Sequence, residues 1–122
     1  KYRSFYFDNE PVEITYTNGV THVDFFRHQE INDNTIVYVF YRNHDYEYPS
    51  KAHFTPLQMH NARILGLKKI DVGNLKVNVP VNELEYLESC YTKGWRIPDP
   101  TWSYLKSPGI LELKGQYGIL HS

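Results

Sequence analysis

The dipeptide Asn18-Gly19, placed between two runs of alternating residues, constrains the fold more than any other feature of this sequence. A tight hairpin turn needs positive φ at both central positions, and Asn and Gly adopt positive φ with little strain. The flanking runs, 12–17 (VEITYT) and 20–26 (VTHVDFF), are rich in the β-branched and aromatic residues that favour strands. The sequence therefore predicts a two-stranded β-hairpin here.

The turn also sets which side chains share a face of the hairpin. Side chains alternate along a strand, so a two-residue turn that pairs Thr17 with Val20 places Glu13 opposite Asp24. One face is then apolar and is predicted to point into the core; its members are Val12, Ile14, Tyr16, Val23 and Phe25. The other face carries Glu13, Thr15, His22 and Asp24.

The two carboxylates on the polar face have two interpretations. Glu13 and Asp24 are either solvated on a wet face, or they bind a divalent cation. Carboxylates directly opposite one another repel by a few tenths to ~1 kcal/mol, and a hard cation with oxygen ligands would turn this repulsion into chelation. His22 is interpreted first as a hydrogen-bonded surface or cross-strand residue, because Mg²⁺ rarely takes imidazole when carboxylates are at hand.

Further strands are predicted from their β-branched and aromatic content: 4–8, 36–41 and 75–79. The run 36–41 is almost continuously apolar, so it is expected to be covered on both faces. Residues 42–62 are predicted to be irregular, since Pro49 and Pro56 exclude a long helix.

One helix is predicted to begin at Asn82. Asn82 can cap the first free N–H groups, Glu85 completes a capping-box pattern, and Gly94 is a natural end. The tail, 99–122, is expected to lie extended and packed on the rest. The predicted fold class is therefore α+β, a mixed β-sheet with a hairpin and few helices, in a single domain or fragment of residues 1–122.

Composition excludes several classes of function. A net charge of −1 lacks the excess of positive charge that is typical of nucleic-acid-binding proteins, so no nucleic-acid partner is expected. The single cysteine, Cys90, excludes an internal disulfide and a multi-cysteine zinc site. Glycine-rich phosphate loops are absent from the sequence. Trp95 and Trp102 are expected to anchor the tail, although an exposed Trp is also a platform on which a sugar can stack.

Several short motifs follow one another in a recognisable order: His22-Val23-Asp24-Phe25, Phe54-Thr55-Pro56-Leu57, Val79-Pro80, Glu85-Tyr86-Leu87, and Tyr91 followed by Trp95-Arg96-Ile97-Pro98. Together they resemble the C-terminal part of the LicD/fukutin family. The resemblance runs from about residue 5 to about residue 105 and is best over 79–98. It implies a partial nucleotidyltransferase-like fold.

The resemblance also implies an activity. Members of this family transfer a phospho-alcohol, such as phosphocholine or ribitol phosphate, from a CDP-linked donor to a glycan or glycoprotein. By resemblance, Asp24 corresponds to an acid that binds Mg²⁺ or Mn²⁺. Glu13 is the second candidate ligand because the hairpin is predicted to place it opposite Asp24. The metal would bridge diphosphate oxygens and neutralise the leaving group. Asp24 and His22 are the candidate catalytic residues, with His22 or another acid as the base.

The resemblance further implies a location: the Golgi lumen for a eukaryotic protein, or the cytoplasm for a bacterial one. A membrane anchor is expected only if an upstream segment is missing here.

Two departures from the family pattern leave alternatives open. The family's Asp-x-Asp pair, which lies upstream of the hairpin, occurs nowhere in these 122 residues. Gly94 also directly precedes Trp95, where the family tends to have Tyr-Gly several residues earlier. The chain is therefore either a fragment or a degenerate member. A non-catalytic binding or scaffolding domain of the same fold and an unrelated small β-rich module remain as alternatives.

Overall fold

The computed structural model describes residues 2–122 and shows a protein made mostly of β-strands. The strands are β1 (Tyr2–Phe7), β2 (Glu10–Thr17), β3 (His22–Phe26), β4 (Gln29–Ile31), β5 (Asn34–Tyr41), β6 (His53–Ala62), β7 (Leu67–Val72), β8 (Leu75–Pro80), β9 (Ile110–Glu112) and β10 (Gly118–His121). One α-helix, α1 (Glu83–Tyr91), and one 3₁₀ turn, η1 (Tyr104–Lys106), complete the described elements.

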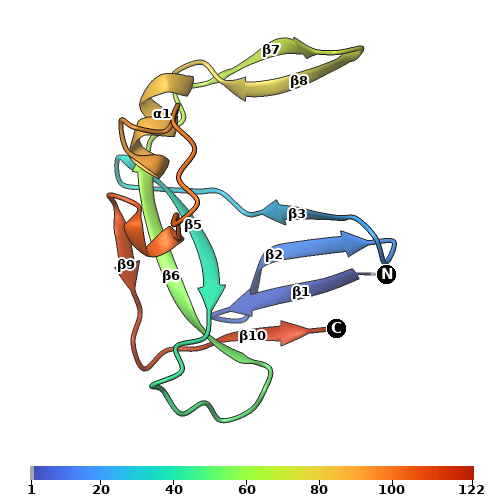
Figure 1. Ribbon diagram of the computed structural model, residues 1–122, viewed down its shortest axis with the longest axis vertical. Coiled ribbons are helices and arrows are strands. Elements are labelled where there is room, and N and C mark those ends of the chain that lie inside the picture. Colours follow the sequence, from blue (N-terminus) through green and yellow to red (C-terminus); the bar gives the residue numbers. More distant parts are fainter. Residues whose placement is uncertain (1) are drawn as a thin grey trace.

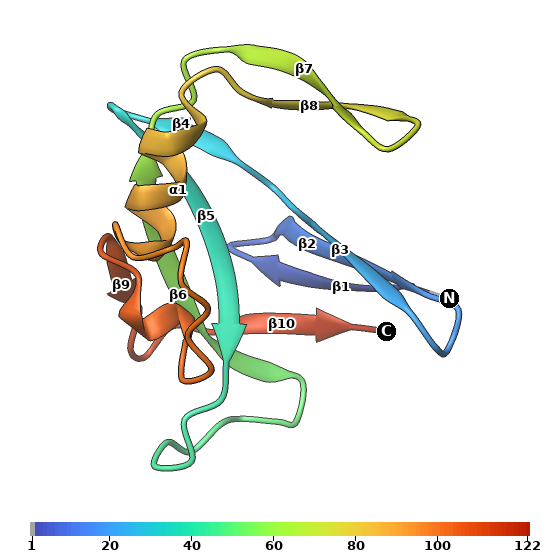
Figure 2. The same cartoon turned by 45° about the horizontal axis from the view of Figure 1, so that its top comes forward.

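Eight of the strands form one curled sheet. Its order is β3-β2-β1-β10-β6-β5-β4, and β9 also pairs with β6. In Figures 1 and 2, β5 and β6 cross the direction of β1, β2 and β10 at a steep angle, so that the sheet bends into a half-barrel. The strands β7 and β8 form a separate two-stranded sheet beside α1.

The predicted α+β class, with a mixed sheet and a partial nucleotidyltransferase-like fold, is wrong. Every strand pair within residues 2–122 is antiparallel. Parallel strands need long crossover connections, usually helices, and α1 is the single α-helix of the described chain. The fold is therefore an antiparallel sheet that includes β10, from the C-terminal end of the chain, between β1 and β6.

The longest strand, β6, lies within the segment that was predicted to be irregular. It pairs with β5 along one side and with β10 and β9 along the other. Pro56 is tolerated because it falls between the partners on that second side: β10 pairs as far as Phe54, and β9 begins to pair at Leu57. Its missing N–H therefore removes no ladder bond, and its carbonyl still accepts a hydrogen bond from the N–H of Leu113 at 3.0 Å.

The core has two parts, one on each face of β5, which confirms that the run 36–41 is covered on both faces. One cluster joins Val37, Val39, Leu57 and Met59 to Cys90 of α1. The other joins Ile36 and Tyr38 to Phe5 and Val12 of the β1–β2 ribbon. Consecutive side chains of β5 point to opposite faces, so an unbroken apolar sequence is needed to fill both clusters.

The hairpin of β2 and β3 forms as predicted, but its register is shifted. Thr17 pairs with His22, Thr15 with Asp24 and Glu13 with Phe26. The turn contains four residues because the Asn18 side chain accepts hydrogen bonds from the N–H groups of Val20 (2.9 Å) and Thr21 (2.8 Å). A shift of two residues preserves the faces, so Thr15 and Asp24 still share one face, although Glu13 no longer lies directly opposite Asp24.

The prediction that the apolar face of this hairpin is the core side is wrong for most of its length. Tyr16, Val23 and Phe25 are 53–57% exposed, whereas Thr15 on the polar face is 2% exposed. The polar face is the inner one because two aromatic side chains share it. Glu13 of β2 pairs with Phe5 of β1 on one side and with Phe26 of β3 on the other, so both rings lie on the face of Glu13. Phe5 belongs to one core cluster, and Phe26 packs against the other.

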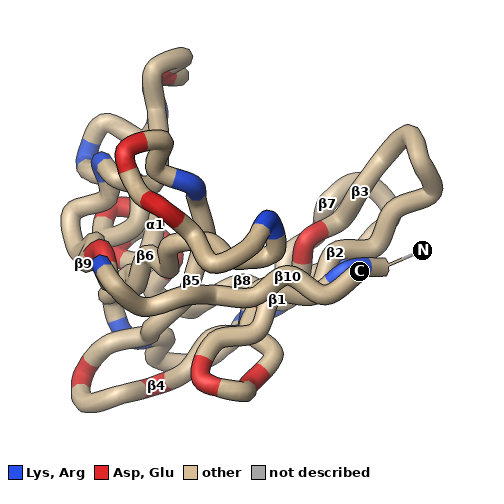
Figure 3. Tube along the Cα trace, turned by 90° about the horizontal axis from the view of Figure 1, so that it is seen from below, with Lys and Arg blue, Asp and Glu red and all other residues tan. Residues whose placement is uncertain are grey.

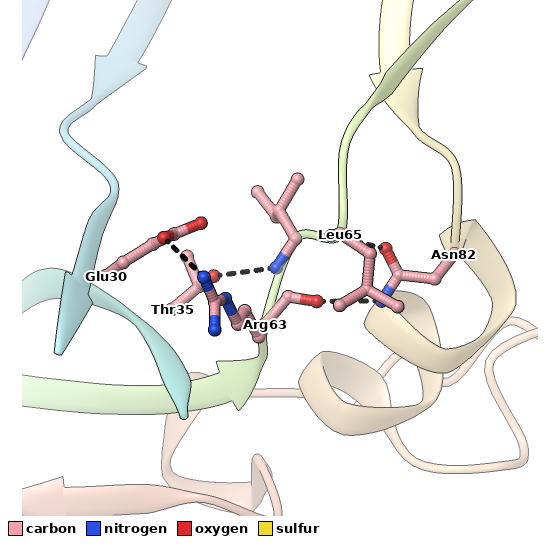
Figure 4. A network of polar contacts seen from close by, with 6 residues as sticks. Glu30, Thr35, Arg63, Leu65 and Asn82 are labelled. Carbon is pink, nitrogen blue, oxygen red and sulfur yellow. Dashed lines mark hydrogen bonds and ion pairs between the residues drawn. The ribbon is translucent and has the colours of Figure 1, made fainter. Parts of the chain in front are cut away.

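The predicted helix is confirmed, but Asn82 does not cap it with its side chain. The Asn82 amide instead accepts a hydrogen bond from the Leu65 N–H (3.1 Å) and donates one to the Arg63 carbonyl (2.8 Å). Figure 4 shows this network, in which Arg63 also reaches Glu30 at 3.6 Å. Asn82 thus fixes the base of the β7–β8 hairpin against the start of α1.

The C-terminal segment contributes strands to the sheet, since β10 lies between β1 and β6. The Ser107 hydroxyl donates a 2.7 Å hydrogen bond to the Cys90 carbonyl and ties this segment to α1. Figure 3 shows acidic and basic residues interspersed along the trace. Among residues 2–122, no helix is long and apolar enough to cross a membrane.

Candidate functional site

The hairpin places a carboxylate cluster on the inner face of the sheet. Arg3 of β1 pairs with Thr15 of β2, and Thr15 pairs with Asp24 of β3, so the three side chains form a row across three strands. Glu13 lies on the same face, two residues further along β2. The sequence correctly predicted that Glu13 and Asp24 share a face, and alternation along the strands is the reason.

Thr15 links the two carboxylates. Its buried hydroxyl lies 2.6 Å from Asp24 Oδ1 and 3.5 Å from Glu13 Oε1. A hydroxyl has one proton, so it donates to the nearer oxygen, that of Asp24. Charge-assisted O–H···O⁻ bonds of this length are strong. Sequence reasoning gave Thr15 no role, although its position between the two acids on the same face was a usable signal.

The environment of Glu13 disfavours its charged form. Partial burial raises the pKa of Glu13 above its usual value and the negative charge of Asp24 adds to this, while Arg3 and the Thr15 hydroxyl act in the opposite direction. Burial also raises the pKa of the Tyr104 hydroxyl, and charges on Cys90, Glu13 and Asp24 add to that effect. Tyr104 of η1 therefore lies close enough for both carboxylates to affect its pKa.

A pH-dependent effect on stability follows for Glu13. The folded state holds the Glu13 proton more tightly than the unfolded state does, so this contribution is complete below about pH 4.5 and is lost as pH rises through the folded pKa. Glu13→Gln, which mimics the protonated form, is expected to raise the free energy of unfolding at pH 7. The gain should stay below about 1 kcal/mol because solvent screens a half-exposed carboxylate.

Urea denaturation of the wild type and Glu13→Gln at pH 4 and pH 7 measures this difference. The stability gain should shrink at pH 4, and Glu47→Gln, at an exposed position, should show no such pH dependence. A destabilising effect of Glu13→Gln at pH 7 would contradict the assignment.

His22 is less well placed than the carboxylates. It is exposed and pairs with Thr17, one step nearer the turn than Asp24 on the same face. No hydrogen bond joins its ring to Asp24 or Glu13 within the described chain. Its predicted catalytic role stays a prediction.

The described side chains do not complete a metal centre at this site. Mg²⁺ demands near-octahedral oxygen coordination, whereas this face offers two carboxylates, one of which already accepts the Thr15 hydrogen bond. Over residues 2–122, no group of three or more His, Cys, Asp or Glu side chains is placed to hold a metal ion. A cation here would need further oxygen ligands from other residues.

A second candidate site is a cavity of about 530 Å³ between the end of α1 and the segment that follows it. Its aromatic walls include Tyr91, Trp95 and Trp102, and Asp99 and Lys106 stand at its edge. The rings of Tyr91 and Trp102 pack with centroids 5.5 Å apart. The sequence predicted that the tryptophans anchor the tail, and their packing beside α1 is consistent with that interpretation.

Arg63 and Lys68, two of the basic residues near the β7–β8 hairpin, are engaged in ion pairs. Lys68 Nζ lies 2.6 Å from Glu83 Oε2, and Arg63 pairs with Glu30. Both pairs are about half exposed, so each is expected to add less than about 1 kcal/mol to stability.

Comparisons with known proteins give a short match to transferases. Over 46 residues the chain is 41% identical to the ribitol-5-phosphate transferase FKTN of Homo sapiens, and equally to that of Macaca fascicularis. The protein of the same name from Mus musculus is 37% identical over 46 residues. The match covers 38% of this chain but only 10% of each relative, so the chain matches about a tenth of their length.

No model of a protein family matches the chain, and no solved structure matches it. Over the matched segment, the chain is therefore similar to transferases.

Proposed function

We propose that this chain is part of a transferase that moves a phospho-alcohol of the ribitol-phosphate type from a CDP-linked donor onto a glycan. The observation that carries the proposal is the 41% identity over 46 residues to ribitol-5-phosphate transferases. The family resemblance of the ordered motifs supports the same class of reaction. The Golgi lumen remains the location that accompanies the proposal for a eukaryotic protein.

In this proposal the carboxylate cluster serves the acceptor side of the reaction. The raised pKa of Glu13 makes it a stronger base than an ordinary carboxylate, so it is suited to accept the proton of an attacking hydroxyl. Asp24, held by the Thr15 hydroxyl, keeps a second negative charge beside it. The Mg²⁺ or Mn²⁺ predicted from the sequence would need ligands beyond the residues described here.

Asp24→Asn should lower transfer by about tenfold or more, because the family resemblance makes Asp24 a catalytic acid of the site and general acid–base groups contribute about a hundredfold or more. The assay measures acceptor-dependent release of CMP from a CDP-linked polyol by the full-length natural protein that contains this sequence. Asp33→Asn, in the exposed turn before β5, is the matched control and should leave the rate within about twofold. Equal rates in wild type and Asp24→Asn would contradict the role of this face.

A non-catalytic binding module is the second candidate function. The observation that favours it is that no three His, Cys, Asp or Glu side chains within residues 2–122 are placed to hold a metal ion. In that case the full-length protein would bind a glycan without releasing CMP from any CDP-linked donor.

A further inference from the structure

The cavity beside α1 has the size and lining of a ligand site. Its volume, about 530 Å³, lies within the range of small-molecule pockets. Tyr91, Trp95 and Trp102 supply flat apolar surfaces, and Asp99 and Lys106 supply polar groups at the rim. Apolar walls with a few placed polar groups are the usual composition of such sites.

Two donors in the cavity walls lack acceptors. The indole N–H groups of Trp95 and Trp102 are buried, and neither has a hydrogen-bond partner among residues 2–122. Leaving a buried N–H unpaired costs about 1–3 kcal/mol. Both nitrogens are closed off from the cavity, so a ligand oxygen that displaced the surrounding wall and reached either of them would recover part of that cost.

We propose that this cavity binds a saccharide, as one sugar ring of a glycan. A sugar ring presents a face of C–H groups that packs on aromatic rings, and its edge carries hydroxyl groups that accept from indole N–H and pair with carboxylate or ammonium groups. The cavity lining offers the aromatic rings and, for the hydroxyl groups, the carboxylate of Asp99 and the ammonium of Lys106, which would exchange their contacts with Thr101 for contacts with the sugar. The proposal deepens the proposed function, on which it rests for the identification of the sugar as part of the acceptor.

A nucleotide is the competing occupant, because a base also stacks on aromatic rings. A nucleotide brings a phosphate that calls for cations. Among the described residues that line the cavity, Lys106 is the cation, and its ammonium already lies 2.7 Å from the Thr101 hydroxyl and 3.8 Å from Asp99. The guanidinium of the neighbouring Arg96 is also engaged, over the Trp95 ring at 4.4 Å. These contacts favour a neutral sugar over a phosphate.

Titration of the ¹⁵N-labelled chain followed by NMR tests the proposal directly. The chain has two tryptophans, so it gives two indole N–H signals, one from each wall residue. The probes are methyl β-galactoside and N-acetylglucosamine as neutral sugars, and CMP as the nucleotide. We expect a sugar to shift both indole signals with saturation in the millimolar range, and we expect CMP to leave them unchanged.

Variants separate binding from folding. Trp102→Ala should abolish the sugar-induced shift of the remaining Trp95 signal. Trp102→Phe keeps an aromatic wall but removes one N–H, so it should raise the dissociation constant about three- to tenfold. Tyr16→Ala, at an exposed aromatic of β2, is the control and should bind as the wild type does.

The outcomes are decisive. Unshifted indole signals with both sugars at 50 mM, or a saturable shift with CMP alone, would overturn the proposal. Sugar binding without transferase activity of the full-length protein would support the saccharide site and contradict the proposed function. Transferase activity without sugar binding at this cavity would support the proposed function and contradict the saccharide site.

Discussion

Gly109→Ala is expected to lower the free energy of unfolding by about 2–4 kcal/mol. An added Cβ at Gly109 would overlap the backbone carbonyl oxygen of His60. That carbonyl belongs to β6, which is fixed by pairing with β5, and the His60 N–H donates to the Gly109 carbonyl at 3.0 Å. Because a strand paired in this way cannot shift cheaply, the clash would separate the C-terminal segment from β6.

Chemical denaturation followed by circular dichroism measures this effect. The matched control is Gly94→Ala, because the nearest atom to its new Cβ, Thr92 Oγ1, is 3.7 Å away, an ordinary contact. The control should stay within about 0.5 kcal/mol of the wild type. Similar losses in both variants would mean that Gly109 does not lie against β6.

Leu57→Ala and Phe25→Ala should have very different costs, although both remove a large apolar side chain. Leu57 is 2% exposed in the cluster beneath α1, so its truncation should cost about 3 kcal/mol through lost burial and a cavity. Phe25 is 57% exposed on the outer face of β3, so its truncation should cost less than about 1 kcal/mol.

The same denaturation experiment compares the two variants, and it tests which face of the β2–β3 hairpin is buried. A loss for Phe25→Ala as large as that for Leu57→Ala would restore the sequence-based prediction that the Val23 and Phe25 face is the core. The structure predicts instead that the smaller loss belongs to Phe25.

Local patterns in the sequence predicted the elements that depend on local interactions. The Asn18-Gly19 dipeptide correctly predicted the hairpin, and the capping pattern that starts at Asn82 correctly predicted α1 (Glu83–Tyr91). The apolar run 36–41 gave a strand covered on both faces. In each case the determining interactions lie within a few residues or follow from simple alternation.

Features that depend on distant partners were missed. Pro56 suggested an irregular segment, yet it lies in β6 at the gap between two partner strands, which sequence alone does not reveal. The buried face of the β2–β3 hairpin was wrong because Phe5 of β1 and Phe26 at the end of β3 decide it. The predicted register of the hairpin was wrong because the side chain of Asn18 closes a four-residue turn in place of a two-residue one.

The candidate site was predictable only in part. Glu13 and Asp24 were correctly placed on one face, since a register shift of two residues leaves faces unchanged. The linking role of Thr15 depends on its buried position, which the sequence assigned to a wet face. The aromatic cavity combines α1 with residues after it, and its shape arises from their packing.

Mass spectrometry of a glycan acceptor, after incubation with the full-length protein and a CDP-linked polyol, tests the central claim most directly. The account predicts that the acceptor gains the mass of one phospho-alcohol unit, and that the gain is strongly reduced by Asp24→Asn. An acceptor of unchanged mass with the donor intact, under conditions in which the protein is folded, would contradict the claim that this chain belongs to a phospho-alcohol transferase.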